Sequence, residues 1–404
     1  MPVHITPSHP LSQQVPPRLF CITLALIWSV AFLLTLSGCG GANNRPVMMV
    51  NQASATALAF VSNSGSGTVS VFSVSNAGAL TPIAGSPFAA GAGAEFMAFD
   101  SAHNLLLVSN QAANSLSVFS VNTSTGVLTA VPGSPFLTGS RPTGVAVAPM
   151  AGLVFVGNQN DSSVSVFSIN SQTGALTPAP ASPVLGIGNP FGLAVNPSER
   201  FLFVNNFRDD STGGANAVSV FQIAASNGGL ARVASPFATS SPAGITSPVG
   251  LVTDGKQLFV GNHMAESVVS LQIDANSGNV SSAAPLPAPG PSCNGSCHNN
   301  PLRLSVDPMD KFVFATNVQA GTVSTFSING GTLSPVAEAT TGQHPFGVSS
   351  DPSGAFLYVV NKVDNSISGF SLNSTSGMLS PLPGFPFSGG SLNAPTDIVI
   401  VSKK

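Results

Sequence analysis

Residues 345–372 read PFGVSSDPSGAFLYVVNKVDNSISGFSL, and this stretch contains the pattern that decides the fold. One apolar run ends at Asn361 and a second covers residues 366–372, and both have the β-branched and aromatic content of strands. The segment PFGVSS lies before a turn that contains proline and glycine. The stretch therefore predicts three consecutive short strands joined by turns.

The pattern recurs seven times along the chain. In each copy an apolar strand ends in asparagine, and we call it the central strand. A second strand such as TVSVFSV (68–74) follows it, and a glycine turn with a third strand such as GALTPIAGSPF (78–88) comes next. Four short strands in units of about 40–50 residues predict the blades of a β-propeller. We interpret the asparagine that ends each central strand as structural, because its side chain can bond the backbone at the turn. These residues are Asn63, Asn110, Asn158, Asn206, Asn262, Asn317 and Asn361.

The two ends of the chain complete each other. The first central strand, residues 57–63, has no strand of the PFGVSS type before it, whereas residues 395–401 (PTDIVIV) supply one. We therefore expect the C-terminal strand to complete the first blade, which closes the ring and removes an exposed sheet edge. The predicted fold is all-β, a seven-bladed β-propeller over residues 56–404.

The composition is that of a β-rich chain with few reactive groups. Of 404 residues, 12 are Lys or Arg and 15 are Asp or Glu, a charged fraction of 7%. An ordinary soluble domain has roughly a quarter. The net charge of −3 and the absence of a basic run in the sequence argue against a nucleic-acid binder. A hydrophobic content of 43% argues against disorder.

The N-terminal region predicts export. Residues 19–36 (LFCITLALIWSVAFLLTL) are uncharged and end at Leu36-Ser37-Gly38-Cys39, which resembles the bacterial lipobox. We expect a lipoprotein signal peptide over residues 1–38, a lipid on Cys39 and a tether over residues 39–55. The protein would then be membrane-anchored in the periplasm or at the cell surface, with the outer membrane favoured by Gly40. An uncleaved signal anchor is the alternative, because the run is long enough to span a bilayer.

Two further cysteines, Cys293 and Cys297, lie in an insertion that reads CNGSCH. In an oxidising compartment we expect a local disulfide between them. A stretched haem-attachment motif and a metal site that includes His298 are competing interpretations. Our prediction is that the protein has neither a metal nor a cofactor.

The repeat P-x-G-V-A-V-x-P-x-G-x-x-x-F/Y-V-x-N…V-S-V-F closely resembles that of the YVTN and lactonase-type seven-bladed propellers. Some members of that family open sugar lactones such as 6-phosphogluconolactone. The resemblance implies a site with Pro-Arg-His before an inner strand and Asn-Glu after the next strand. Here Phe346 and Gly347 stand at the Arg and His positions, and Lys362 replaces the Glu. An arginine is retained one place later in the preceding unit, as Arg303. These replacements argue against hydrolysis of the family type and leave room for a sugar or peptide ligand.

The sparse ionisable residues gather in the loops that leave the central strands and in those that enter the inner strands. In a propeller these loops emerge on one face, here called the top face, and loops on a rigid scaffold commonly bind ligands. The competing interpretation is that they are exposed positions where any charge is tolerated. The candidate catalytic residues are Glu95, Arg303 and His344, and the candidate ligand-binding residues are Arg141, Arg208, His263, Glu266, Lys362 and Asp397.

We therefore expect a monomeric, lipid-anchored extracytoplasmic propeller that acts as a binding or scaffold module. Its partners would be the membrane, through Cys39, and a small sugar-like ligand or an envelope protein, and no nucleic acid. The alternative is a sugar-lactone hydrolase with a rearranged site that uses Glu95, Arg303 and His344. A role in adhesion or in a surface layer is the third hypothesis.

Overall fold

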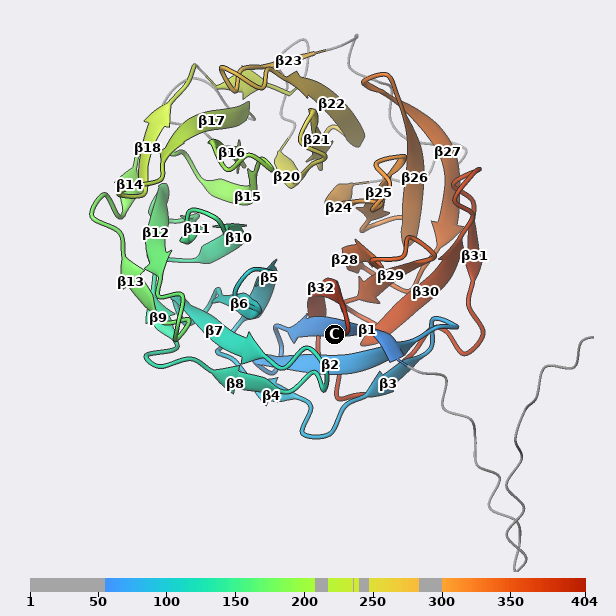
Figure 1. The fold of residues 1–404 in the computed structure, drawn as a ribbon. Coiled ribbons are helices and arrows are strands. Elements are labelled where there is room, and N and C mark those ends of the chain that lie inside the picture. The colour runs from blue at the N-terminus through green and yellow to red at the C-terminus, as the bar shows by residue number, and fades with distance from the viewer. Residues whose placement is uncertain (1–54, 208–216, 235, 240–246, 283–299) are drawn as a thin grey trace, which may run out of the picture. The chain divides into compact units, whose positions relative to one another are not determined.

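The computed structural model describes residues 55–207, 217–234, 236–239, 247–282 and 300–404. Cys39, Arg208, Cys293 and Cys297 lie outside these residues, as do the predicted signal peptide and nearly all of the tether. The regular elements of the described residues are all strands, which form seven antiparallel sheets around a ring (Figure 1). The predicted all-β, seven-bladed propeller is confirmed. Within the described residues, no helix is long and apolar enough to cross a bilayer.

Each sheet is one blade, and its strands follow one another outward from the ring centre. The innermost strands are β32 (Pro395–Ser402), β5 (Ala94–Asp100), β10 (Pro142–Ala148), β15 (Pro190–Val195), β20 (Pro248–Thr253), β24 (Pro301–Val306) and β28 (Pro345–Ser350). In that order they define blades 1 to 7. The second strands are β1 (Ala55–Asn63), β6 (Leu105–Asn110), β11 (Leu153–Asn158), β16 (Phe201–Asn206), β21 (Gln257–Asn262), β25 (Phe312–Asn317) and β29 (Phe356–Asn361).

The outer half of each blade is less uniform. The third strands are β2 (Thr68–Ser75), β7 (Ser115–Val121), β12 (Ser163–Ile169), β17 (Ala217–Ala224), β22 (Ser267–Ile273), β26 (Thr322–Asn329) and β30 (Ser366–Leu372). The fourth strands are β3 (Leu80–Pro82), β8 (Leu128–Ala130), β13 (Leu176–Pro178), β18 (Gly229–Arg232), β23 (Val280–Ser282), β27 (Thr332–Thr340) and β31 (Leu379–Pro381). Blades 1 to 4 add a two-residue strand on the third strand, namely β4 (Phe88–Ala89), β9 (Phe136–Leu137), β14 (Val184–Leu185) and β19 (Phe237–Ala238).

The segment predicted as one strand over residues 78–88 is therefore two. Gly85 has a φ of 83°, which turns the chain out of the sheet between β3 and β4. The backbone N–H of Val71 on β2 then donates to the hydroxyl of Ser86 in the turn, at 2.8 Å. In blade 6 this turn is absent, and β27 pairs with β26 from Thr332 to Thr340.

The ring closes where the first and last strands meet (Figure 1). β32 pairs antiparallel with β1, from Ala57 opposite Ser402 to Asn63 opposite Pro395. The C-terminal strand thus completes blade 1, as predicted.

The core lies between the blades. On β1, Leu58 and Phe60 pack against blade 2, whereas Ala59 and Val61 face the opposite way and pack against blade 7. Both faces of the sheet are buried, so its strands consist of nearly continuous apolar runs. The scarcity of charge follows from this burial.

The recurrent asparagine is structural. In blade 7 the Nδ2 of Asn361 donates to the hydroxyls of Ser366 and Ser368, at 3.0 and 2.9 Å. Its Oδ1 accepts a hydrogen bond from the backbone N–H of Gly342, at 3.1 Å. The same two hydroxyl positions serve the asparagines of blades 1, 2, 3 and 6. Hydroxyls of the third strand are thus its main partners, in addition to the predicted backbone group.

Each inner strand has an irregularity at its second or third residue. In β10, Pro142 lies opposite Asn158 but Val145 lies opposite Val156, so two residues have no regular partner. Comparable shifts occur in the other six inner strands. Such bulges redirect side chains and are frequent beside binding sites. The residues at the third position are Phe96, Gly144, Gly192, Gly250, Arg303, Gly347 and Asp397.

Candidate functional site

A hollow of about 200 Å³ lies at the centre of the ring. Residues of all seven inner strands line it, five of them from the bulged third position. Its charged lining residues are Arg303 and Asp397.

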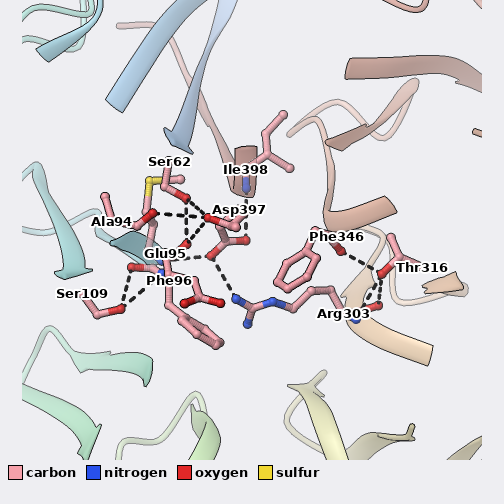
Figure 2. Close-up of polar contacts among 12 residues, drawn as sticks. Ser62, Ala94, Glu95, Phe96, Ser109, Arg303, Thr316, Phe346, Asp397 and Ile398 are labelled. Carbon is pink, nitrogen blue, oxygen red and sulfur yellow. Dashed lines mark hydrogen bonds and ion pairs between the residues drawn. The ribbon is translucent and has the colours of Figure 1, made fainter. Parts of the chain in front are cut away.

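Arg303 crosses the centre of the ring. Its guanidinium Cζ lies 3.7 Å from the centroid of the Phe96 ring, and its Nη2 lies 3.9 Å from Oδ2 of Asp397 (Figure 2). Arg303 belongs to blade 6, whereas these partners belong to blades 2 and 1. Blade 7 lies between, and it has Gly347 at the equivalent position, so no side chain at that position stands in the way.

The Asp397 carboxylate is held by the backbone. Its Oδ2 accepts a hydrogen bond from the N–H of Met97, at 2.9 Å, and its Oδ1 accepts one from the N–H of Ile398, at 3.0 Å. Burial raises the pKa of Asp397, and Arg303 and the two N–H groups partly oppose this. Oδ2 of Asp397 lies 3.9 Å from Nη2 of Arg303, so the two groups form an ion pair without a hydrogen bond.

Two donors of Arg303 consequently have no acceptor. Nε and Nη2 are both buried, and neither makes a hydrogen bond within the part of the chain that is described. The N–H groups of Nε and Nη2 lie side by side on one edge of a guanidinium, and this edge can bind both oxygens of a carboxylate. A buried donor without an acceptor is costly, so an unfilled pair in a hollow indicates a place for a ligand.

Glu95 is the second acidic residue of this region. It is 8% exposed and precedes Phe96 on β5. Burial is the largest influence on its carboxyl and raises the pKa of Glu95. The nearby cations Arg303, Lys362 and Arg141 oppose part of this increase. The hydroxyl of Ser62 donates to the backbone carbonyl of Glu95 at 2.7 Å, which fixes the bulge (Figure 2).

The other side of the ring centre is aromatic and glycine-rich. The Phe96 ring is 1% exposed and meets Phe191 of blade 4 edge to face, with centroids 5.2 Å apart. Phe191 in turn lies 5.7 Å from Phe207. Gly144 and Gly192 present backbone to the hollow, because a Cβ at either would lie under 3.0 Å from the next inner strand. The charged groups of the site thus come from blades 6, 1 and 2, whereas the lining residues of blades 3, 4, 5 and 7 are apolar or glycine.

Two histidines predicted for the site lie apart from its centre. His344 is exposed and lines a different hollow, between blades 6 and 7, together with Asp364. His263 forms a reciprocal pair with Asn300, in which its Nδ1 lies 3.2 Å from the carbonyl oxygen of Asn300. Burial lowers the pKa of His263, which favours the neutral ring. Neither histidine lines the central hollow.

The remaining predicted residues lie at the top face but not in the hollow. Arg141 precedes β10 and is exposed, and Glu266 is in the turn between β21 and β22. The Nζ of Lys362 lies 4.6 Å from the centroid of Phe346, at the rim. The structure therefore brings together Glu95, Arg303 and Asp397.

Phe96 and Phe191 were missed by the sequence analysis. A signal for Phe96 existed, because four inner strands have glycine at the third position and three do not. The three exceptions are Phe96, Arg303 and Asp397, which are the residues that meet at the centre.

The family model described as lactonase, 7-bladed β-propeller matches residues 49–247 and 250–390. The chain belongs to the lactonase family of seven-bladed propellers. A search of curated protein sequences finds no match.

Solved structures agree on the fold. A putative 6-phosphogluconolactonase from Bacteroides fragilis is 18% identical, with a TM-score of 0.70 over 87% of this chain and 99% of its own. A protein from Lactobacillus plantarum is 19% identical, with a TM-score of 0.73 over 86% of this chain and 100% of its own. A periplasmic gluconolactonase from Pseudomonas aeruginosa is 17% identical, with a TM-score of 0.69 over 86% and 99%.

The departure from the family pattern at Gly347 has a geometric reason. A Cβ at this position would lie 2.7 Å from Cα of Asp397 and 2.9 Å from the N of Ile398. The inner strands of blades 7 and 1 therefore approach too closely for a histidine at residue 347. Within the described residues, no group of three or more His, Cys, Asp or Glu side chains is placed to bind a metal.

Proposed function

We propose that this lactonase-family propeller is an extracytoplasmic binding module whose central hollow takes a small acidic ligand such as a sugar acid. The observation that carries the proposal is the buried, acceptor-free pair Nε and Nη2 of Arg303. A ligand carboxylate would accept a hydrogen bond from each of the two donors.

The surroundings of Arg303 favour an anion with hydroxyl groups. Three cations, Arg303, Lys362 and Arg141, influence Glu95, against the two acidic groups Glu95 and Asp397. The backbone exposed at Gly144 and Gly192 gives a small molecule a close approach to the inner strands.

Gluconate and sorbitol test the proposal, since they share a polyol chain and only gluconate has a carboxylate. We expect titration calorimetry to show gluconate binding to the mature domain at least ~10-fold more tightly than sorbitol, about 1.4 kcal/mol. Arg303→Met should abolish the preference, because it keeps an apolar stem over Phe96 without the donors. His344→Ala is the matched control and should bind like the wild type. The proposal is contradicted if the wild type binds the two compounds with equal affinity, or if Arg303→Met prefers gluconate as strongly as the wild type does.

A second candidate function is hydrolysis of a sugar lactone. Glu95 favours it, because burial raises its pKa toward the range of a general base and because Arg303 is its strongest charged neighbour. Arg303 would donate to the lactone carbonyl while ionised Glu95 takes a proton from the attacking water. The water oxygen bonds to the carbonyl carbon, the ring C–O bond breaks, and the alkoxide takes up the proton to give a hydroxy acid. The names of the relatives from B. fragilis and P. aeruginosa agree with this chemistry.

A pH-stat assay with glucono-δ-lactone, corrected for spontaneous hydrolysis, separates the two functions. If the protein is a hydrolase, turnover should exceed the background and should fall about 10²-fold or more in Glu95→Gln and in Arg303→Met. His344→Ala should retain full turnover, because its side chain lies in another hollow. If lactone hydrolysis does not exceed the spontaneous rate and gluconate still binds, the protein is a binding module and not a hydrolase of this lactone.

The proposal includes anchoring by a lipid on Cys39. The lipobox-like Leu36-Ser37-Gly38-Cys39 at the end of an apolar run supports it. We expect the wild-type protein to take up labelled palmitate and to lose residues 1–38, as autoradiography and intact mass measure, and we expect Cys39→Ala to do neither. A wild-type protein that takes up no label and keeps residues 1–38 indicates an uncleaved signal anchor instead.

A further inference from the structure

At one position of the repeat, the side chain fills the space between its own blade and the next blade. It lies opposite the second residue of the third strand, at the outer edge of the sheet. The paired residues are Val69 with Phe88, Leu116 with Phe136, Val164 with Val184, Val218 with Phe237, Val323 with Ala339, and Ile367 with Phe387. Four of the six are phenylalanine, and blade 6 has the smallest side chain, Ala339.

At the other interfaces for which the paired residue is described, a side chain of the protein lies in this space. The ring of Phe387 packs edge to face on Phe72 of blade 1, with centroids 5.4 Å apart. Between blades 3 and 4 the smaller Val184 is compensated, because the guanidinium of Arg232 lies 4.9 Å from the centroid of Phe221. Phe221 and Phe72 hold the same position in their blades.

The interface between blades 6 and 7 is different. Ala339 packs against the cluster that contains Phe370, the counterpart of Phe72. A hollow of about 370 Å³ opens beside Phe370, with walls from Phe385, Pro381 and Pro386. We name this hollow the blade 6–7 slot. It is apolar at its base and has Asp364 and Thr341 at its rim.

The slot continues into a second hollow of about 460 Å³ on the top face. The two share Thr340, Thr341, Gly342 and Asp364, and the second also has the exposed His344 and Gln343 in its lining. An apolar recess beside a larger hollow of mixed polarity suits a side chain that enters the recess while its backbone lies along the larger hollow.

We infer that the blade 6–7 slot binds a phenylalanine side chain presented by an extended peptide of a partner protein. The repeat itself supplies the reason for the choice of residue, since four other blades place a phenylalanine ring at this position. Flat rings also pack favourably edge-on against aromatic walls such as Phe370 and Phe385. The slot lies at the outer edge of the ring and shares no lining residue with the central hollow, so it is independent of the proposed function.

N-acetyl-phenylalanine methylamide is the probe, and N-acetyl-alanine methylamide is its matched control. By ligand-observed NMR titration the wild type should bind the phenylalanine probe at least ~10-fold more tightly, as expected for burial of a ring. Ala339→Phe fills the slot from within, so it should lose the probe and melt at a higher temperature than the wild type. Ala89→Phe adds the same ring at an exposed strand position and should retain probe binding without a gain in melting temperature.

A second variant keeps the test decisive if Ala339→Phe does not fold. Pro381 is an exposed wall residue, so Pro381→Asp should abolish probe binding at an unchanged melting temperature. Arg303→Met should bind the probe like the wild type, which separates this inference from the central site. The inference is overturned if both probes bind equally, or if folded Ala339→Phe or Pro381→Asp binds the phenylalanine probe like the wild type.

Discussion

Asp397 and Arg303 are close enough to attract each other, yet they do not form a hydrogen bond. The backbone N–H groups of Met97 and Ile398 hold the two oxygens of Asp397 in place, with Oδ2 3.9 Å from Nη2 of Arg303. Each oxygen keeps a free lone pair, so it is the fixed position of the carboxylate on the bulged inner strands that leaves Nε and Nη2 of Arg303 without an acceptor among the described residues.

The pKa of Glu95 gives a prediction at the same scale. Its usual value is 4.5, and burial raises it in the folded protein. The folded state thus binds the proton of Glu95 more tightly than the unfolded state, so the contribution of Glu95 to stability is complete below pH 4.5 and is lost as the pH rises through the folded pKa. Each pH unit of increase in the pKa is worth about 1.4 kcal/mol. Burial also raises the pKa of Asp397, so Asp397 adds to the decrease in stability with rising pH.

Glu95→Gln removes the contribution of Glu95 alone. We expect the variant to match the wild type near pH 4, where the carboxyl is protonated, and to be progressively more stable toward pH 7. Urea unfolding at several pH values measures the difference. A difference in unfolding free energy that does not change with pH argues against a raised pKa.

At the scale of the strand, the sequence predicts the order of the strands and their positions in the blade well, because each strand has a recognisable local sequence pattern. The asparagine is present in every copy, and in five of the seven copies hydroxyl residues follow it five and seven places later. The split of the outer strand into β3 and β4 was missed, because the turn at Gly85 is held by a hydrogen bond from the N–H of Val71 to the hydroxyl of Ser86, which joins residues on different strands. The blade 6–7 slot was missed for a similar reason, since Ala339 is unusual only when its cross-strand partner is known.

The candidate site was predicted only in part. Glu95, Arg303 and Asp397 stand in blades 2, 6 and 1, and they meet because the ring closes around them. Sequence patterns place each residue at the top face, but they do not give its direction across the centre. Arg303 is the third residue of an inner strand, whereas His344 comes just before one, and His344 lines the outer hollow rather than the central one.

At the scale of the whole molecule, the ring depends on β32. This strand pairs with β1, and Ile398, Ile400 and Val401 pack into the interfaces of blade 1 with blades 7 and 2. Burial of each such side chain is worth roughly 1.5–3 kcal/mol. Their sum is comparable with the whole stability of a typical protein, about 5–15 kcal/mol. The last eight-residue strand therefore carries a share of the stability far above its length.

Truncation after Asn393 tests this dependence. It removes β32, exposes the edge of β1 and takes Asp397 out of the central site. We expect a cooperative loss of structure, seen by circular dichroism as a melting temperature lowered by tens of degrees or as no folded state. Truncation after Ser402 is the control, because it removes only Lys403 and Lys404 beyond the strand and should melt close to the full chain. If the chain ending at Asn393 melts like the full chain, the seven blades do not stabilise one another through closure of the ring.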